Sequence, residues 1–210
     1  MDIRARVVQL LRHASGFDFS EVVCGRVVVN NGRSLEAEVL GVKYKAEIVD
    51  NDNVRLRIFD PLNRTEDSSR LIEYLLNAIE RALKHGIPKS RGNFIRLAQL
   101  PGGCSAQLYE RRITNFLMAE MEGSTVKEVE ASAKAIGGCL VEHASADWSI
   151  EVSPFSDVRI RVAYWQGEEE MPSNVTILVG EEAIVSEVPI QELIVLIEMA
   201  VNRFVQFYRR

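Results

Sequence analysis

The residues best suited to chemistry lie in a basic, glycine-rich stretch between residues 84 and 112. It holds six Lys and Arg side chains against one acid, Glu110. Exposed N–H groups of a glycine-rich loop beside Arg side chains can hold a phosphate group. No Walker A or G-x-G-x-x-G motif is present, so the alternative is a solvated connector. The candidate phosphate or nucleic-acid contacts are Lys89, Arg91, Arg96, Gly102, Gly103, Arg111 and Arg112.

Cys104 is the candidate nucleophile, in a Gly-Gly-Cys-Ser turn that predicts the start of a helix. A helix N-terminus favours the thiolate form of cysteine. Catalysis also needs a base within hydrogen-bond reach, and the sequence does not bring His85 or His143 to this loop. The alternative is a small apolar packing residue, which is also our interpretation of Cys139.

Composition limits the classes of protein. The chain has 210 residues, 25 Lys and Arg, 30 Asp and Glu, and a net charge of −5. Its three cysteines and three histidines are scattered, so we expect no zinc finger, local iron–sulfur motif or zincin site. Sparse cysteines fit a reducing cytoplasm. Charges interrupt the apolar stretch 188–208, so we expect no membrane segment, and the first residues show no secretory leader.

Charge is unevenly distributed along the chain. Residues 1–112 hold 18 basic and 14 acidic side chains, whereas residues 113–210 hold 7 and 16. Such asymmetry can mark a surface for a partner. The alternative is a pair of solvated surfaces that attract each other.

The first part of the chain predicts a helix, several strands and a second helix. Helical spacing of apolar residues covers 2–14, and Asn31-Gly32 is typical of a hairpin turn. Alternating patterns predict strands at 34–39, 42–49 and 54–59. A long helix should then begin with Thr65 or Ser68 as its cap and end at Gly86 in a left-handed conformation.

The second part predicts a similar order. Residues 87–104 are loop-rich, residues 105–121 look helical, and Thr125 with Glu128 fits a capping box for a helix that ends near Gly137. A final helix should run from 189 to 208. Runs of strands between helices indicate the α+β class with antiparallel sheet. Five strands are predicted between the last two helices, at 139–143, 148–153, 158–164, 175–179 and 183–188.

The two long helices resemble each other at an offset of 122 residues. Leu71-Ile72, Ala78-Ile79 and Arg81 match Leu193-Ile194, Ala200-Val201 and Arg203. We expect a single compact unit over 1–210, with pseudo-repeats 1–86 and 124–210 joined by a connector, 87–123. The alternative is that two buried helices share Leu, Ile and Ala by chance.

Several short motifs carry a family resemblance. They are Arg70-Leu-Ile-Glu-Tyr-Leu-Leu, Asn93-Phe-Ile-Arg-Leu-Ala-Gln-Leu-Pro-Gly-Gly, Tyr109, the segment 165–172, and Asn174-Val-Thr-Ile-Leu-Val. Across about residues 5–208 the chain resembles an uncharacterised prokaryotic family, domain of unknown function 3786. It departs where that family tends to have Asp, at Cys139 and at Gln166-Gly167. The resemblance implies a cytosolic prokaryotic protein tied to corrinoid or iron–sulfur metabolism, without an established activity.

These observations favour a non-catalytic binding or accessory protein that acts through protein contacts in the cytoplasm. Two alternatives remain: a small-molecule enzyme or cofactor-associated protein that uses the Cys104 loop, and a nucleic-acid binder that uses Lys84–Arg112. The sequence predicts no metal site. It specifies neither a cofactor nor an oligomeric state.

Overall fold

The computed structural model describes residues 3–13, 19–23, 27–30, 33–49, 53–88, 93–168 and 171–210. It confirms the α+β class with antiparallel sheets. Two compact units emerge: unit 1, residues 1–89 with 154–157, and unit 2, residues 90–153 with 158–210. No helix in the described part of the chain is both long and apolar enough to cross a bilayer. The pseudo-repeats and their connector stay predictions.

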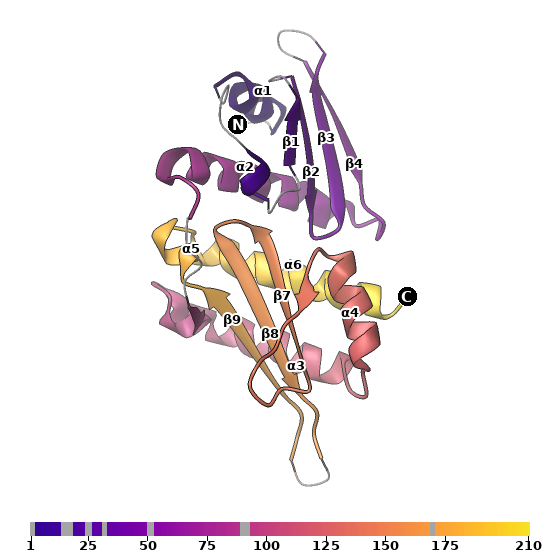
Figure 1. Cartoon of the computed structure of the whole chain (residues 1–210). Coiled ribbons are helices and arrows are strands. Elements are labelled where there is room, and N and C mark those ends of the chain that lie inside the picture. Colours follow the sequence, from indigo (N-terminus) through magenta and orange to yellow (C-terminus); the bar gives the residue numbers. More distant parts are fainter. Residues whose placement is uncertain are drawn as a thin grey trace. The chain divides into compact units, whose positions relative to one another are not determined.

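Unit 1 is a four-stranded antiparallel meander with two main helices. Its sheet order is β1-β2-β3-β4, so each strand pairs with its neighbour in sequence. Figure 1 shows α2 running across one face of this sheet. Its elements are α1 (Ile3–His13), η1 (Phe19–Glu21), β1 (Val27–Asn30), β2 (Ser34–Val39), β3 (Val42–Ile48), β4 (Val54–Phe59) and α2 (Thr65–His85).

The core of unit 1 follows from period-two alternation in the strands. Leu35 and Ala37 of β2 and Tyr44 of β3 are buried, whereas the residues between them are not. The Tyr44 hydroxyl donates a 2.7 Å hydrogen bond to the backbone carbonyl of Ser68 and so ties β3 to α2. Leu75, like the other apolar residues on that side of α2, is buried. The opposite face of the sheet therefore carries the polar side chains.

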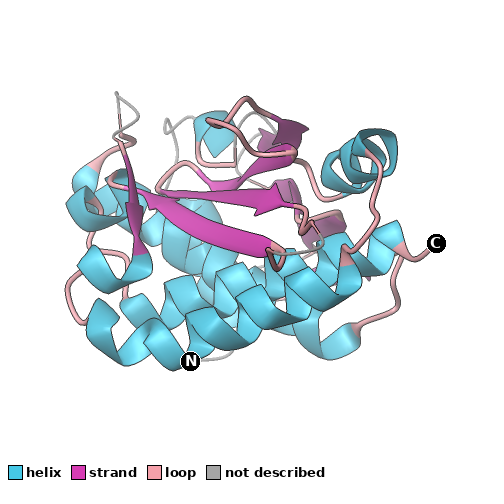
Figure 2. Ribbon diagram, turned by 90° about the horizontal axis from the view of Figure 1, so that it is seen from below, coloured by secondary structure: helices cyan, strands magenta, loops and turns pink. Residues whose placement is uncertain are grey.

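Unit 2 has a five-stranded sheet in the order β5-β9-β8-β7-β6. Figure 2 shows long helices layered against strands, and α3 contacts both β9 and α6. Its elements are β5 (Phe94–Arg96), η2 (Leu97–Gln99), η3 (Gly103–Ala106), α3 (Gln107–Glu120), α4 (Val126–Ala135), β6 (Cys139–Leu140), β7 (Trp148–Phe155), β8 (Val158–Trp165), β9 (Asn174–Gly180), α5 (Glu182–Val185) and α6 (Ile190–Tyr208).

Aromatic side chains organise the core of unit 2. The rings of Trp148 and Tyr164 stack with centroids 4.9 Å apart and planes 7° apart. Phe204 of α6 packs against Trp148 at 5.9 Å. Arg203 is fully buried on the same helix. The amphipathic pattern predicted α6, but it did not predict the burial of this arginine.

The helix ends confirm one cap prediction and contradict another. Thr125 and Glu128 form the predicted capping box, each bonding to the other's backbone N–H. At α2, however, Arg64 occupies the N-cap position and makes no side-chain cap bond. Ser68 lies inside the helix, where its hydroxyl donates to Asp60 instead. Gly86 ends α2 with φ +80° and ψ 171°, so its conformation is not the left-handed helical one we expected.

Three further predictions were wrong. Residues 183–188 form no strand, because α5 makes a helical turn there, with the Val188 N–H donating to the carbonyl of Ala183. Phe94–Arg96, which we assigned to loop, forms β5 because it pairs with β9. Cys139 is exposed rather than packed in the core, since it lies on the edge strand β6. The predicted turn at Asn31-Gly32 lies outside the described residues.

Candidate functional site

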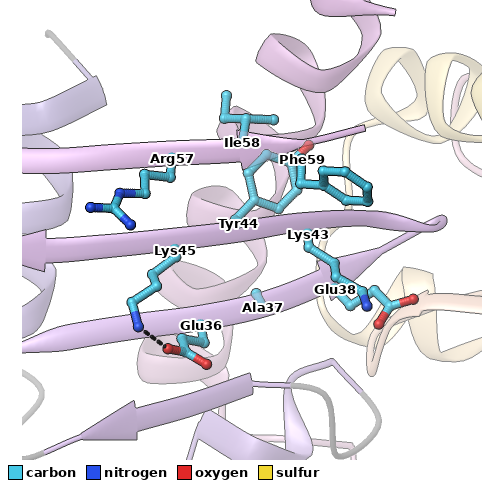
Figure 3. Close-up of a pocket in the computed structure, with 9 residues that line it drawn as sticks. All are labelled: Glu36, Ala37, Glu38, Lys43, Tyr44, Lys45, Arg57, Ile58 and Phe59. Carbon is cyan, nitrogen blue, oxygen red and sulfur yellow. Dashed lines mark ion pairs between the residues drawn. The ribbon is translucent and has the colours of Figure 1, made fainter. Parts of the chain in front are cut away.

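The candidate site is an open hollow of about 440 Å³ on the outer face of β2, β3 and β4 in unit 1. Figure 3 shows side chains from the three strands gathered over this face. Alternation fixes this arrangement, because every second residue of each strand must point away from α2. The lining residues whose side chains share this outer face are Glu36, Glu38, Lys43, Lys45, Arg57 and Phe59. Ala37, Tyr44 and Ile58 also line the hollow, from strand positions whose side chains belong to the opposite face.

Strand register aligns the charged side chains of the hollow in rows. Glu36 lies opposite Lys45, and Lys45 lies opposite Arg57 on the next strand. The Lys45 ammonium is 2.7 Å from Glu36 and 3.2 Å from Glu47. Hydrogen bonds from these two carboxylates, and their negative charge, raise the pKa of Lys45. Lys45 therefore stays charged at neutral pH and is already satisfied within the sheet.

Arg57 and Phe59 are two of the groups that the sheet leaves available. Arg57 lies directly opposite another cation, Lys45, and forms no ion pair with the described part of the chain. Phe59, two residues further along the same face of β4, is 64% exposed. A guanidinium beside exposed apolar surface is a combination found at protein interfaces, where Arg and aromatic residues are enriched. The hollow thus offers a charged group and an apolar one to the same ligand.

The sheet of unit 2 carries similar charges; Glu151, Arg159 and Glu182 are buried, and Arg161 is partly buried. Arg159 donates to both carboxylate oxygens of Glu182, at 2.8 and 3.2 Å, and Arg161 donates to Glu151 at 2.8 Å. The guanidinium carbons of Arg159 and Arg161 lie 4.2 and 4.0 Å from the centre of the Phe94 ring. This geometry allows cation–π attraction to both arginines. The charged groups of Arg159, Arg161, Glu151 and Glu182 are therefore paired with one another inside unit 2.

Gly180 permits this closure of the unit 2 network. A Cβ atom placed on Gly180 would lie 2.2 Å from Oε1 of Glu182. A side chain at this position would require the Glu182 carboxylate, the end of a flexible side chain, to move from its place over the end of β9. Glu182 is 4% exposed and Arg159 is 7% exposed. We therefore interpret this cluster of buried ion pairs as a contribution to the stability of unit 2 rather than as a binding site.

The predicted phosphate contacts do not gather into one described site. Lys89 and Arg91 lie outside the described residues. Arg96 lies on β5, and Arg111 and Arg112 lie exposed on α3. Arg112 is already engaged, at 2.5 Å from Glu198 and 5.5 Å from the centre of the Tyr109 ring.

Glu110 is the one acid of this basic stretch, and it is partly buried. Burial raises the pKa of its carboxyl, and the positive charge of Arg96 partly offsets that rise. Arg96 on β5 and Glu110 on α3 are therefore close enough for an electrostatic attraction between them. The nucleic-acid hypothesis stays a prediction.

The glycines of the predicted loop have packing roles. Gly102 has φ +75°, a left-handed conformation that other residues rarely adopt. A Cβ atom on Gly103 would lie 1.8 Å from the backbone oxygen of Leu97, so only glycine fits there. Cys104 is exposed beside them. An apolar cavity of about 310 Å³ lies near Pro101 and Ile190, but Cys104 is not one of its lining residues.

His143, the other histidine considered as a base, contacts an aromatic ring. Its ring meets Trp165 edge-on at 5.8 Å, beside a hollow of about 550 Å³ that Asp147 and Trp148 line. Within the described residues, no group of three or more His, Cys, Asp or Glu side chains could hold a metal ion.

The sequence analysis missed Arg57 and Phe59 as site residues. Their signal was present in Val54-Arg-Leu-Arg-Ile-Phe59, whose alternation predicted a strand and so implies one buried and one solvent-exposed face. Phe59 lies on the wet face, where the pattern otherwise places arginine. A large aromatic residue at such a position is a sequence-level indication of a binding surface.

Comparison with known proteins identified a family but no characterised relative. A family model described as domain of unknown function (DUF3786) matches residues 21–203, which is most of the chain. No curated protein and no solved structure matched the chain.

Proposed function

The chain belongs to the family described as domain of unknown function (DUF3786), and we propose that it is a non-catalytic binding protein that contacts a protein partner through unit 1. The proposed contact surface is the outer face of β2, β3 and β4. We propose that it works in the cytoplasm of a prokaryotic cell. The exposed free thiols of Cys104 and Cys139 suit a reducing compartment.

One observation carries the proposal: the hollow of unit 1 combines Phe59, exposed to 64%, with a row of charged side chains. Burying exposed apolar surface favours association, at about 25 cal/mol per Å² of area removed from water. Charged groups around it add selectivity for one partner over another.

Comparative capture tests this function. Tagged full-length protein, its Phe59→Asp variant and a Leu108→Asp control are each incubated with lysate of the native host. Bound proteins are then quantified by mass spectrometry. Leu108 is a matched control, because it is 78% exposed on α3 of unit 2.

We expect a partner that the parent protein and the Leu108→Asp control both retain. Phe59→Asp should lose most of it, because a carboxylate cannot replace the exposed ring that the partner covers on binding. Circular dichroism verifies that each variant is folded. A partner that all three proteins retain equally, or no enriched partner at all, would overturn the proposal.

A further inference from the structure

The two units differ at the outer edge of the last strand of the meander, which, in the described part of the chain, pairs with a further strand only in unit 2. In unit 2, β5 fills the open side of β9, with Phe94 opposite Gly180 and Arg96 opposite Leu178. In unit 1, β4 is the last strand in the sheet order, and no fifth strand follows it among the described residues. A three-residue strand is therefore enough to cover such an edge in this chain.

The open part of β4 is its second half. Helix α1 contacts β4, and Val54 at the start of the strand is only 7% exposed, whereas Ile58 is 40% exposed. The Val49 N–H donates to the carbonyl of Asn53 at 2.9 Å. Hydrogen bonding alternates along an antiparallel pair, so the N–H and C=O groups of Leu56 and Ile58 point away from β3.

By strand register, one charged residue of the outer face has no opposite charge across from it on the described strands. Glu36 and Glu38 lie opposite Lys45 and Lys43, and Glu47 lies opposite Arg55. Arg57 alone lies opposite a like charge, Lys45. Opposite charges on directly facing strand positions stabilise a sheet, and like charges destabilise it. An acid on the far side of β4 would supply the counter-charge that Arg57 lacks.

We propose that β4 accepts an extended, acidic segment of the partner protein as a fifth strand along Leu56–Phe59. The segment places a carboxylate opposite Arg57 and an apolar side chain against Phe59. Its backbone bonds to Leu56 and Ile58, as in other complexes where a peptide extends a sheet. This inference rests on the proposed function and specifies the chemistry of its partner.

Peptide binding to the full-length chain tests the proposal. The probe is a short fluorescein-labelled peptide that repeats Glu-Thr-Val-Thr, so that glutamate and valine alternate on one face of the added strand; it is titrated by fluorescence anisotropy. A second peptide has lysine in place of glutamate. A third keeps the glutamates but carries N-methyl groups on the backbone nitrogens that would bond to β4, so it retains the charge and loses the donors.

We expect the glutamate peptide to bind about tenfold more tightly than either control peptide. Arg57→Glu should reverse the preference, so that the lysine peptide binds better. Lys127→Glu is the control, an exposed cation on α4 whose reversal should change neither affinity. Arg57→Gln replaces Arg57→Glu if the latter does not fold, and should abolish the preference.

Three results would overturn the inference: no binding of the glutamate peptide up to its solubility limit, equal binding of the N-methylated peptide, or an unchanged preference in Arg57→Glu. Capture that depends on Phe59 without peptide binding would remove this inference and leave the proposed function standing. Failure of both experiments would remove both.

Discussion

Unit 1 and unit 2 share an order of elements, a helix followed by a four-stranded antiparallel meander and a second helix. They also share a pair of charges, with an acid on the second strand bonded to a base on the third. Glu36 pairs with Lys45 in unit 1, and Glu151 pairs with Arg161 in unit 2. We propose that this likeness reflects the duplication of 1–86 and 124–210.

The units differ in what covers these charges. In unit 2, β5 brings Phe94 against the arginines and α5 brings Glu182 back over Gly180. In unit 1, no described strand extends the sheet beyond β4, and the face holds an open hollow. The same strand pattern therefore holds internal ion pairs where another strand and helix cover its charged side chains, as in unit 2. Where they stay uncovered, as in unit 1, it offers a candidate binding surface.

The largest expected effect comes from breaking the cluster of buried ion pairs in unit 2. Glu182→Ala leaves Arg159 buried without this partner, and loss of one member of a buried ion pair costs about 3 kcal/mol. Urea unfolding followed by tryptophan fluorescence checks this, because Trp148 and Trp165 both lie in unit 2. Glu36→Ala in unit 1, followed by circular dichroism, should cost much less, since exposed pairs contribute little. Equal losses would contradict the comparison.

Removal of the Phe94 ring and removal of the Phe59 ring should change stability by different amounts. Phe94→Ala removes a ring that contacts two arginines, and we expect it to destabilise unit 2 by about 2 kcal/mol in urea unfolding. Phe59→Ala should change the free energy of unfolding by less than about 0.5 kcal/mol, because the ring is mostly exposed. A large loss of stability in Phe59→Ala would mean that this ring is structural.

The N-termini of α4 and α2 also differ, because only α4 has a side-chain cap, and this difference predicts a smaller effect on stability. Thr125→Ala removes the cap of α4 and should cost about 1 kcal/mol. Thr65→Ala is its control in unit 1 and should cost little, since no side chain caps α2. Thermal unfolding by circular dichroism distinguishes them. Equal shifts of the melting temperature would show that the capping box contributes nothing.

Titration of Glu128 gives that cap a pH dependence. Hydrogen bonds from Thr125 lower the pKa of the Glu128 carboxyl below 4.5. Its stabilisation is therefore complete above the pKa of the unfolded chain and is lost as pH falls through the folded value. The difference between the parent protein and Glu128→Gln should disappear in acid, and a difference that persists at low pH would contradict this assignment.

The smallest expected effect concerns Lys45. Glu36 and Glu47 raise its pKa, so its contribution is present below pH 10.5 and is lost as pH rises through the folded value. Because the group is exposed, Lys45→Met should change stability less than Thr125→Ala does. The change should shrink further in 1 M salt, where the screening length is about 3 Å. A change that grows with salt would argue for an apolar role of the side chain.

The strands and long helices of the fold could be predicted from the sequence, because their apolar periodicity is local. The bounds of β2 and β4 match the predicted 34–39 and 54–59. Residues 183–188 misled the prediction, because Ile184 and Val185 favour strands by propensity. A tertiary contact, the bond from Arg159 to Glu182, favours the helical turn of α5 instead.

The candidate site was less predictable, because it depends on which strand ends the sheet. Phe94 looked like part of a loop until its pairing with β9 was known. Likewise, the charged residues of β4 looked like an ordinary wet face. Nothing local in either segment indicates that one edge is covered and the other is not, since that difference arises from long-range pairing.

Site-specific photo-crosslinking tests the central claim, that unit 1 contacts the partner, most directly. A photoreactive benzoylphenylalanine is placed at position 59 of the full chain, and at position 108 in a parallel protein, in cells of the native host. We predict that illumination joins a second protein covalently to the chain at position 59 and not at position 108. An adduct only at 108, or the same adduct at both positions, would contradict the account.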